Sequence, residues 1–156
     1  MARLYEYQSK SLLKAGGLRI PEGRVAVSPE EARAAAEAIG KPVVLKIQVW
    51  ATGRAEKGGI QFADTPDDAY QKAHGLLGLD IDHFTVEKIL VEERLDIKEE
   101  YFAGLVIDDE QKIPLLILSR SGGTGIDIRD PGGRGLRALG HPQLDPRASV
   151  VSCEVQ

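Results

Sequence analysis

The most constraining feature of the sequence is a buried-strand pattern that contains a lysine and runs directly into a glycine-bearing loop. Residues 43–49 are mostly apolar or β-branched, which is typical of a strand inside a sheet, and Lys46 sits in their middle. The loop that follows carries three glycines and two cations: Gly53, Gly58, Gly59, Arg54 and Lys57. Such a loop beside a strand lysine is typical of a phosphate-binding arrangement, because backbone N–H groups and an ammonium can both reach an anion.

Two ordinary explanations stay open for this stretch taken alone. A lysine in a strand often lies on the solvated face with its stem flat against the protein. A glycine-rich turn often only joins two strands. The stretch matches neither the Walker A motif nor the Rossmann glycine pattern.

The composition is that of a globular protein, with 42% hydrophobic and 28% charged residues among 156. No apolar run is long enough to span a bilayer, and the acidic Glu6 interrupts the region where a signal peptide needs its apolar core. The single cysteine, Cys153, excludes an internal disulfide and fits a reducing cytoplasm. The net charge of -4 argues against nucleic acid as the main partner. We therefore expect a cytoplasmic protein with no membrane and no nucleic-acid partner.

Local signals predict alternating strands and helices over the first 93 residues. Residues 4–14 form a predicted helix and residues 23–27 a strand. Capping patterns at Ser28 and at Thr65 start two further helices with small apolar stripes. A returning strand is expected at 59–63 and another at 88–93.

The second half of the chain has a different character. Residues 101–107 and 113–118 predict a β-hairpin. From Ser121 onward glycines crowd the sequence, and we expect a loop that is mobile between residues 122 and 147. Residues 148–155 are compatible with a final strand.

The sequence resembles the β subunit of succinyl-CoA synthetase and its relatives, malate–CoA ligase and ATP-citrate lyase. The resemblance covers about residues 1–125 and rests on motifs that follow the family's order at closely similar spacings. These are Glu6-Tyr7-Gln8 with Lys10, Gly17-Leu18 with Pro21 and Gly23, Val44 with Lys46 and Gln48-Val49, Gly53-Arg54, Lys57-Gly58-Gly59, Leu90-Val91-Glu92, and Asp96-Ile97 with Glu100 and Gly104.

The resemblance implies an α+β fold of the ATP-grasp type, in which two lobes hold a nucleotide between them. Residues 23–93 would form the small lobe. Residues 1–22 and 94–156 would form part of the larger lobe, including the glycine-rich tail. The implied ligand is ATP or GTP, and the implied activity is that of an acid–CoA ligase of the tricarboxylic acid cycle.

The resemblance also implies roles for six residues. Lys46 would contact phosphate, and Gly53 and Arg54 would lie in the loop that closes over the phosphates. Glu92 and Leu95 would sit in the interlobe connection, where backbone groups bind the adenine edge. Glu100 would accept hydrogen bonds from the ribose hydroxyls.

Departures from the family pattern limit what the resemblance implies. Trp50, Thr52, Ala55 and Glu56 replace a histidine, two glycines and a lysine of the family, and Glu56 places a negative charge in the phosphate loop. The magnesium ligands of the family would fall after Gln156, so no residue is assigned to the metal or to catalysis. We expect the isolated chain to bind nucleotide better than it catalyses.

Two functions stay open on this basis. The chain could be a nucleotide-binding component that works with an α-type CoA-binding subunit or a complementary chain. Alternatively, it could be a catalytically silent binding or regulatory relic of the family. The resemblance leaves the organic acid and the choice between ATP and GTP undefined.

Overall fold

The structure, a computed structural model, describes residues 3–108, 113–119 and 137–139. It divides into two compact units, Met1–Asp96 and Ile97–Val155, which are described separately. The tail predicted to be mobile and the final strand at 148–155 fall outside the described residues, apart from 137–139. The predicted division into a lobe at 23–93 and a second lobe stays a prediction.

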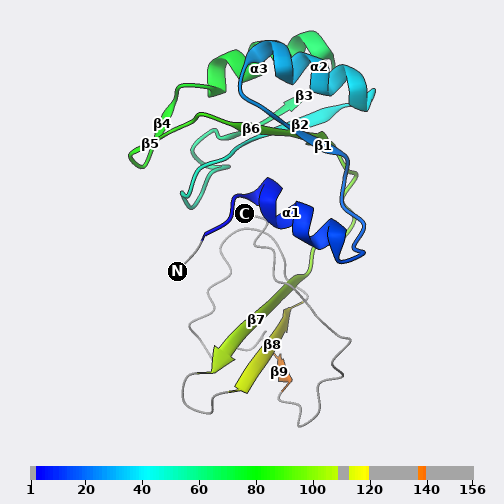
Figure 1. The fold of residues 1–156 in the computed structure, drawn as a ribbon, viewed down its shortest axis with the longest axis vertical. Helices are drawn as coiled ribbons and strands as arrows, with labels where there is room; N and C mark the ends of the chain where they lie inside the picture. The colour runs from blue at the N-terminus through cyan, green and yellow to red at the C-terminus, as the bar shows by residue number, and fades with distance from the viewer. Residues whose placement is uncertain (1–2, 109–112, 120–136, 140–156) are drawn as a thin grey trace. The chain divides into compact units, whose positions relative to one another are not determined.

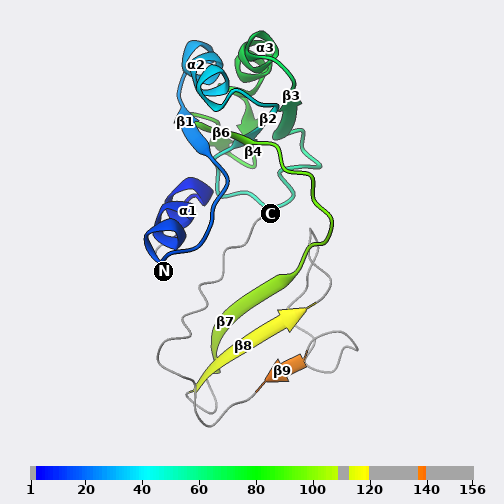
Figure 2. The ribbon, with the colours of Figure 1, turned by 90° about the vertical axis from the view of Figure 1, so that its right-hand side faces the viewer.

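The first unit is built on a four-stranded antiparallel sheet in the order β1-β6-β2-β3. The strands are β1 (Gly23–Ala26), β2 (Val43–Ile47), β3 (Ile60–Ala63) and β6 (Ile89–Glu93). Two helices, α2 (Pro29–Ile39) and α3 (Pro66–Leu76), lie side by side on one face (Figure 1). The third, α1 (Glu6–Ala15), lies on the other side of the sheet (Figure 2). This order of strands and helices confirms the predicted α+β class.

The predicted caps explain where α2 and α3 begin. The Ser28 hydroxyl accepts from the Glu31 N–H, and the Thr65 hydroxyl accepts from the Asp68 N–H. Glu31 reaches one residue further than a standard capping box and accepts from the Val27 N–H. Gly40 ends α2 at a φ of 67°, where glycine carries no steric penalty.

The core forms between the two helices and the sheet. Because α2 and α3 turn alanines toward the strands, the helices approach closely enough to cover large strand side chains. The largest fully buried side chains are Leu45, Ile47, Ile89, Val43, Val86 and Val91. No helix in the described ranges is long and apolar enough to cross a membrane.

A short hairpin missing from the prediction follows α3. Strands β4 (Asp80–Ile81) and β5 (Phe84–Thr85) pair around Asp82 and His83, which both have positive φ. This backbone suits the right-handed twist of a two-residue hairpin. The strands are too short to leave a periodic signal in the sequence.

In the second unit, β7 (Phe102–Asp108) and β8 (Ile113–Ser119) pair antiparallel, which confirms the predicted hairpin. A third strand, β9 (Arg137–Leu139), pairs with β8. The prediction of a loop throughout the tail is therefore wrong at residues 137–139. Pairing with a strand distant in sequence overrides the local glycine-rich composition there.

Packing against β2 requires a glycine at position 59, which was not predicted from the sequence. A Cβ built on it would lie 2.4 Å from Ile47 Cδ1 and 2.9 Å from the Arg54 carbonyl oxygen. The loop before β3 therefore packs against β2 only because residue 59 has no side chain.

We expect Gly59→Ala to lower the free energy of unfolding by about 1–3 kcal/mol through overpacking. Gly75→Ala is the matched control, because a Cβ there meets nothing within 4 Å; it should raise stability by about 0.4–1 kcal/mol. Urea unfolding of both variants checks the pair. Equal stability of Gly59→Ala and the parent protein would contradict this packing.

Candidate functional site

The first turn of helix α1 is hydrogen-bonded to the residue that follows β2. The Gln8 side chain accepts from the Tyr5 N–H at 2.9 Å, and the Gln48 side chain accepts from the Tyr7 N–H at 3.4 Å. These bonds satisfy backbone donors that a helix start leaves open. Glu6 and Lys10 lie four residues apart and therefore share the helix face that looks onto the sheet.

A buried group of five ionised side chains fills the space between α1 and the sheet. We call this group the charged cluster, and its members are Glu6, Lys10, Lys46, Arg54 and Glu92. They come from α1, β2, the loop after β2, and β6. Each side chain in it is at most 13% exposed.

Two carboxylates connect the three cations. Glu6 Oε1 lies 3.0 Å from both Lys46 Nζ and Lys10 Nζ. Glu6 Oε2 accepts from Arg54 Nη2 at 3.1 Å. Glu92 bonds Lys10 Nζ at 2.5 Å and Lys46 Nζ at 2.9 Å. Among the described residues, the cluster therefore holds three cations and two carboxylates.

The charges reinforce one another despite their burial. Burial by itself would raise the pKa of the Glu6 carboxyl, but Lys46 and Lys10 outweigh it and hold that pKa below its ordinary value. Burial by itself would lower the pKa of Lys46, but Glu6 and Glu92 outweigh it and raise that pKa. Both groups are therefore ionised at neutral pH.

The loop at residues 50–59 uses much of its backbone internally. The N–H groups of Lys57, Gly58 and Gly59 donate to carbonyls of residues 53, 55 and 54. The sequence suggested that such groups close on an anion, but these three are occupied within the loop. Arg54 fixes the loop to β2 by donating to the Ile47 carbonyl at 2.8 Å. These three N–H groups are therefore already used within the loop.

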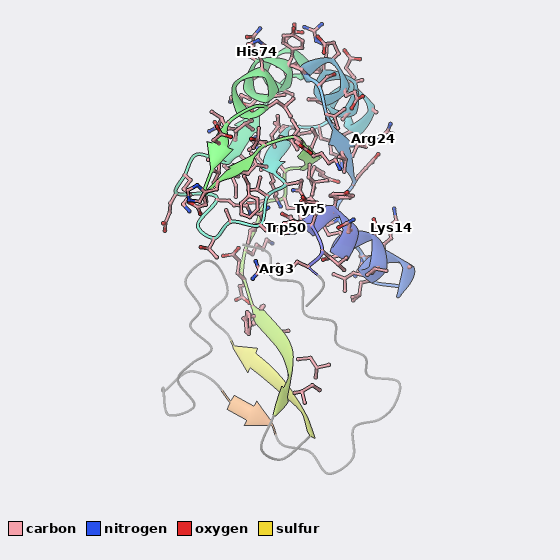
Figure 3. The ribbon with its side chains drawn as sticks, turned by 60° about the vertical axis from the view of Figure 1, so that its left-hand side comes forward. Arg3, Tyr5, Lys14, Arg24, Trp50 and His74 are labelled. Atoms are coloured by element: carbon pink, nitrogen blue, oxygen red, sulfur yellow. The ribbon has the colours of Figure 1, made fainter. Side chains whose placement is uncertain are left out.

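An aromatic stack ties the start of this loop to α1. The Trp50 ring stacks on Tyr5 at 4.8 Å between centroids and 3° between planes (Figure 3). Phe84 of β5 meets Trp50 edge-on at 6.1 Å. Trp50, which departs from the family pattern, thus packs between the start of α1 and β5 and helps to set the loop's position.

The structure brings together three of the six predicted site residues, namely Lys46, Arg54 and Glu92. Gly53 lies beside Arg54 at a φ of 64°. Leu95 is 52% exposed. Glu100 is exposed and belongs to the second unit, so its ribose role stays a prediction.

Two findings differ from what the sequence suggested. Glu92 lies within β6, paired with both neighbouring strands, and its side chain joins the charged cluster. Lys46 is not on a solvated face: its side chain is 13% exposed and bonds two carboxylates. Its removal would therefore affect folding as well as ligand binding.

Sequence reasoning missed Glu6 and Lys10 as members of the site. They entered the sequence analysis only as part of a motif that supports the family resemblance, and their partners lie about 40 and 80 residues away in the chain. Within the ranges that the structure describes, no three His, Cys, Asp or Glu side chains gather in a way that could hold a metal ion.

We expect the stability contributed by Glu6 to depend on pH. Its folded pKa is lowered, so the contribution is present above the unfolded pKa of about 4.3 and is lost as pH falls through the folded value. The parent protein should exceed Glu6→Gln in free energy of unfolding at pH 6, and the difference should shrink toward pH 3. A difference that stays constant over this range would contradict the assigned ion pairing.

Comparison with known proteins gives the chain a family. The sequence model described as the ATP-grasp domain matches residues 3–129. The β subunit of a GDP-forming succinate–CoA ligase from Thermus thermophilus is 45% identical over 92% of this chain and 37% of its own length. The β subunit of an ADP-forming succinate–CoA ligase from Gemmatimonas aurantiaca is 43% identical over 97% of this chain and 39% of its own length. The chain thus spans less than two fifths of these two curated relatives.

Solved structures show the same fold. A dinucleotide-forming acetyl-coenzyme A synthetase from Ca. Korarchaeum cryptofilum superposes with a TM-score of 0.66 at 25% identity, covering 74% of this chain and 52% of that one. An ATP citrate lyase from Methanothrix soehngenii superposes with a TM-score of 0.59 at 20% identity, covering 78% of this chain and 32% of that one. With the family match extending over most of its residues, this chain belongs to the ATP-grasp family.

Proposed function

We propose that the chain binds the phosphates of ATP or GTP through Lys46 and Arg54, as the nucleotide-binding component of an acid–CoA ligase related to succinyl-CoA synthetase. The observation that carries this proposal is that one carboxylate, that of Glu6, bonds both cations and holds them side by side. Two ionised donors held side by side suit a phosphate group, because ionised donors form the strongest hydrogen bonds to phosphate.

The remaining nucleotide contacts are inferred from the family pattern. Because Glu92 is paired on both sides within β6, the backbone at Leu95 would meet the adenine edge, and Glu100 would take the ribose hydroxyls. An apolar slot with a few fixed polar groups is the usual setting for a purine. The acetyl-coenzyme A synthetase that shares the fold was solved with coenzyme A and Ca-AMPCP, which supports a nucleotide ligand in this family.

Magnesium would accompany the nucleotide in a ligase of this type. The described residues provide no cluster of metal ligands, so the residues assigned here do not fit a protein-held magnesium site. A metal bound with the nucleotide would neutralise charge on the phosphates. No step of the reaction is assigned to it.

The proposed partner is an α-type CoA-binding subunit or a complementary chain. Relatives that are more than twice as long carry the name succinate–CoA ligase subunit β, so a subunit that holds CoA is the expected counterpart. We infer an organic acid as the acyl donor, and the specific acid stays open. A cytoplasmic location also remains a prediction.

A specific observation favours the alternative of a silent nucleotide-binding relic. Glu56 is exposed, and its Oε2 atom would lie 3.5 Å from a Cβ placed on Gly53. A carboxylate at this point of the loop opposes phosphate binding by electrostatic repulsion. The two functions differ in whether nucleotide affinity leads to turnover once a partner subunit is present.

We expect Lys46→Met to weaken ATP binding by about tenfold to a hundredfold. A hydrogen bond to a charged group contributes about 1.5–3 kcal/mol. Methionine keeps most of the stem volume but removes the bonds to Glu6 and Glu92, so folding of the variant is checked by circular dichroism. Calorimetric titration of ATP and GTP, with and without magnesium, measures the change.

Lys41→Met is the matched control, because Lys41 is also ion-paired but its side chain is 61% exposed in the turn between α2 and β2. It should bind ATP like the parent protein. Equal affinity of Lys46→Met and Lys41→Met would exclude Lys46 as a phosphate contact.

We expect Glu56→Lys to strengthen ATP binding by about fivefold. Reversing one surface charge near the phosphates is worth about 1 kcal/mol. Glu37→Lys, the same change on the exposed face of α2, controls for net charge. The gain should shrink at high salt. Unchanged affinity at low salt would mean that residue 56 does not face the nucleotide.

A further inference from the structure

The Glu6 carboxylate bonds the two cations, Lys46 and Arg54, that the proposed function assigns to phosphate binding. We propose that Glu6 is a positioning residue that sets the spacing and direction of Lys46 and Arg54 for the nucleotide phosphates. This inference rests on the proposed function, and it names a residue on a segment that the predicted site did not include.

The two oxygens of one carboxylate divide their bonds between two segments. Oε1 lies 3.0 Å from Lys46 Nζ on β2, and Oε2 lies 3.1 Å from Arg54 Nη2 in the loop. The guanidinium bonds the Ile47 carbonyl through its other terminal nitrogen. Glu6 thereby fixes the orientation of Arg54. It also sets the distance between the Lys46 ammonium and the Arg54 guanidinium, because each bonds one oxygen of the same carboxylate.

Lys46 keeps capacity for a ligand in this arrangement. An ammonium has three N–H donors, and in the described part of the chain Glu6 and Glu92 accept two of them. A third donor therefore remains for a phosphate oxygen. The two carboxylates therefore orient the lysine but accept only two of its three N–H donors.

A competing interpretation is that Glu6 acts as an internal competitor that phosphate must displace. Several contacts oppose displacement. The Glu6 side chain is 2% exposed and also bonds Lys10 of its own helix. The neighbouring residues Tyr5 and Tyr7 are held by Trp50 and Gln48. Removing Glu6 from the cluster would require the start of α1 to move, so the geometry favours a fixed scaffold.

The test is a double-mutant cycle read by ATP titration. The parent protein, Glu6→Gln, Lys46→Met and the double variant are compared, with Glu37→Gln on the exposed face of α2 as the control. We expect Glu6→Gln to weaken ATP binding by about tenfold or more. In the Lys46→Met background the same change should cost less than in the parent protein, because only the positioning of Arg54 is then lost.

Fluorescence provides a readout that is independent of nucleotide. Trp50 is the only tryptophan of the chain and stands at the start of the loop. If Glu6 positions the loop, Glu6→Gln should shift Trp50 emission without ATP, whereas Glu37→Gln should not.

The outcomes separate the two claims. Absence of ATP binding by the parent protein would overturn the proposed function and this inference with it. Binding by the parent with unchanged affinity in Glu6→Gln would overturn only the role of Glu6. Tighter binding by Glu6→Gln would show that the carboxylate competes with phosphate. Equal losses in both backgrounds would show that Glu6 does not act through Lys46.

A second variant covers the case in which Glu6→Gln fails to fold, as judged by circular dichroism. Glu6→Asp keeps the charge but is one methylene shorter, so it cannot reach both cations at the same distances. We expect it to fold and to bind ATP about threefold to tenfold more weakly than the parent. If Glu6→Asp binds ATP like the parent protein, only the negative charge at residue 6 is required, and the exact placement of the carboxylate is not.

Discussion

The first unit depends on a buried network in which every charge has an opposite partner. Removing five ionised side chains from water is costly, and the cost is offset only when hydrogen bonds and ion pairs replace hydration. Glu6 and Glu92 meet this condition by bonding the three cations of the charged cluster. Because its members come from α1, β2, β6 and the loop, the cluster fixes these segments relative to one another.

The same cluster forms the proposed anion site of a first unit whose core is rich in alanine. The core lies between the sheet and α2 and α3, and the opposite face of the sheet carries Lys46 and Glu92 beside the buried Val44 and Leu90. Gly59 lets the loop pack on Ile47, and Trp50 joins the loop to Tyr5. Hydrophobic contacts thus place the loop, and the charges determine what it can bind.

Local chemistry made much of the fold predictable. The helix caps at Ser28 and Thr65 and the β7–β8 hairpin depend on residues that are close in the sequence, so they could be predicted from it. Strand β9 and the partners of Glu6 could not, because long-range contacts alone create them. Lys46 could be recognised as a candidate from the sequence, but its burial could not. The two carboxylates that bond it, Glu6 and Glu92, belong to α1 and β6, which are distant in the sequence.

A crystal structure of the chain with a non-hydrolysable ATP analogue tests the central claim most directly. The account predicts phosphate oxygens within about 3 Å of Lys46 Nζ, with Glu6 still bonded to both Lys46 and Arg54. Phosphates bound away from these cations would contradict the proposed site. A Glu6 side chain displaced by phosphate would contradict the scaffold role of that carboxylate.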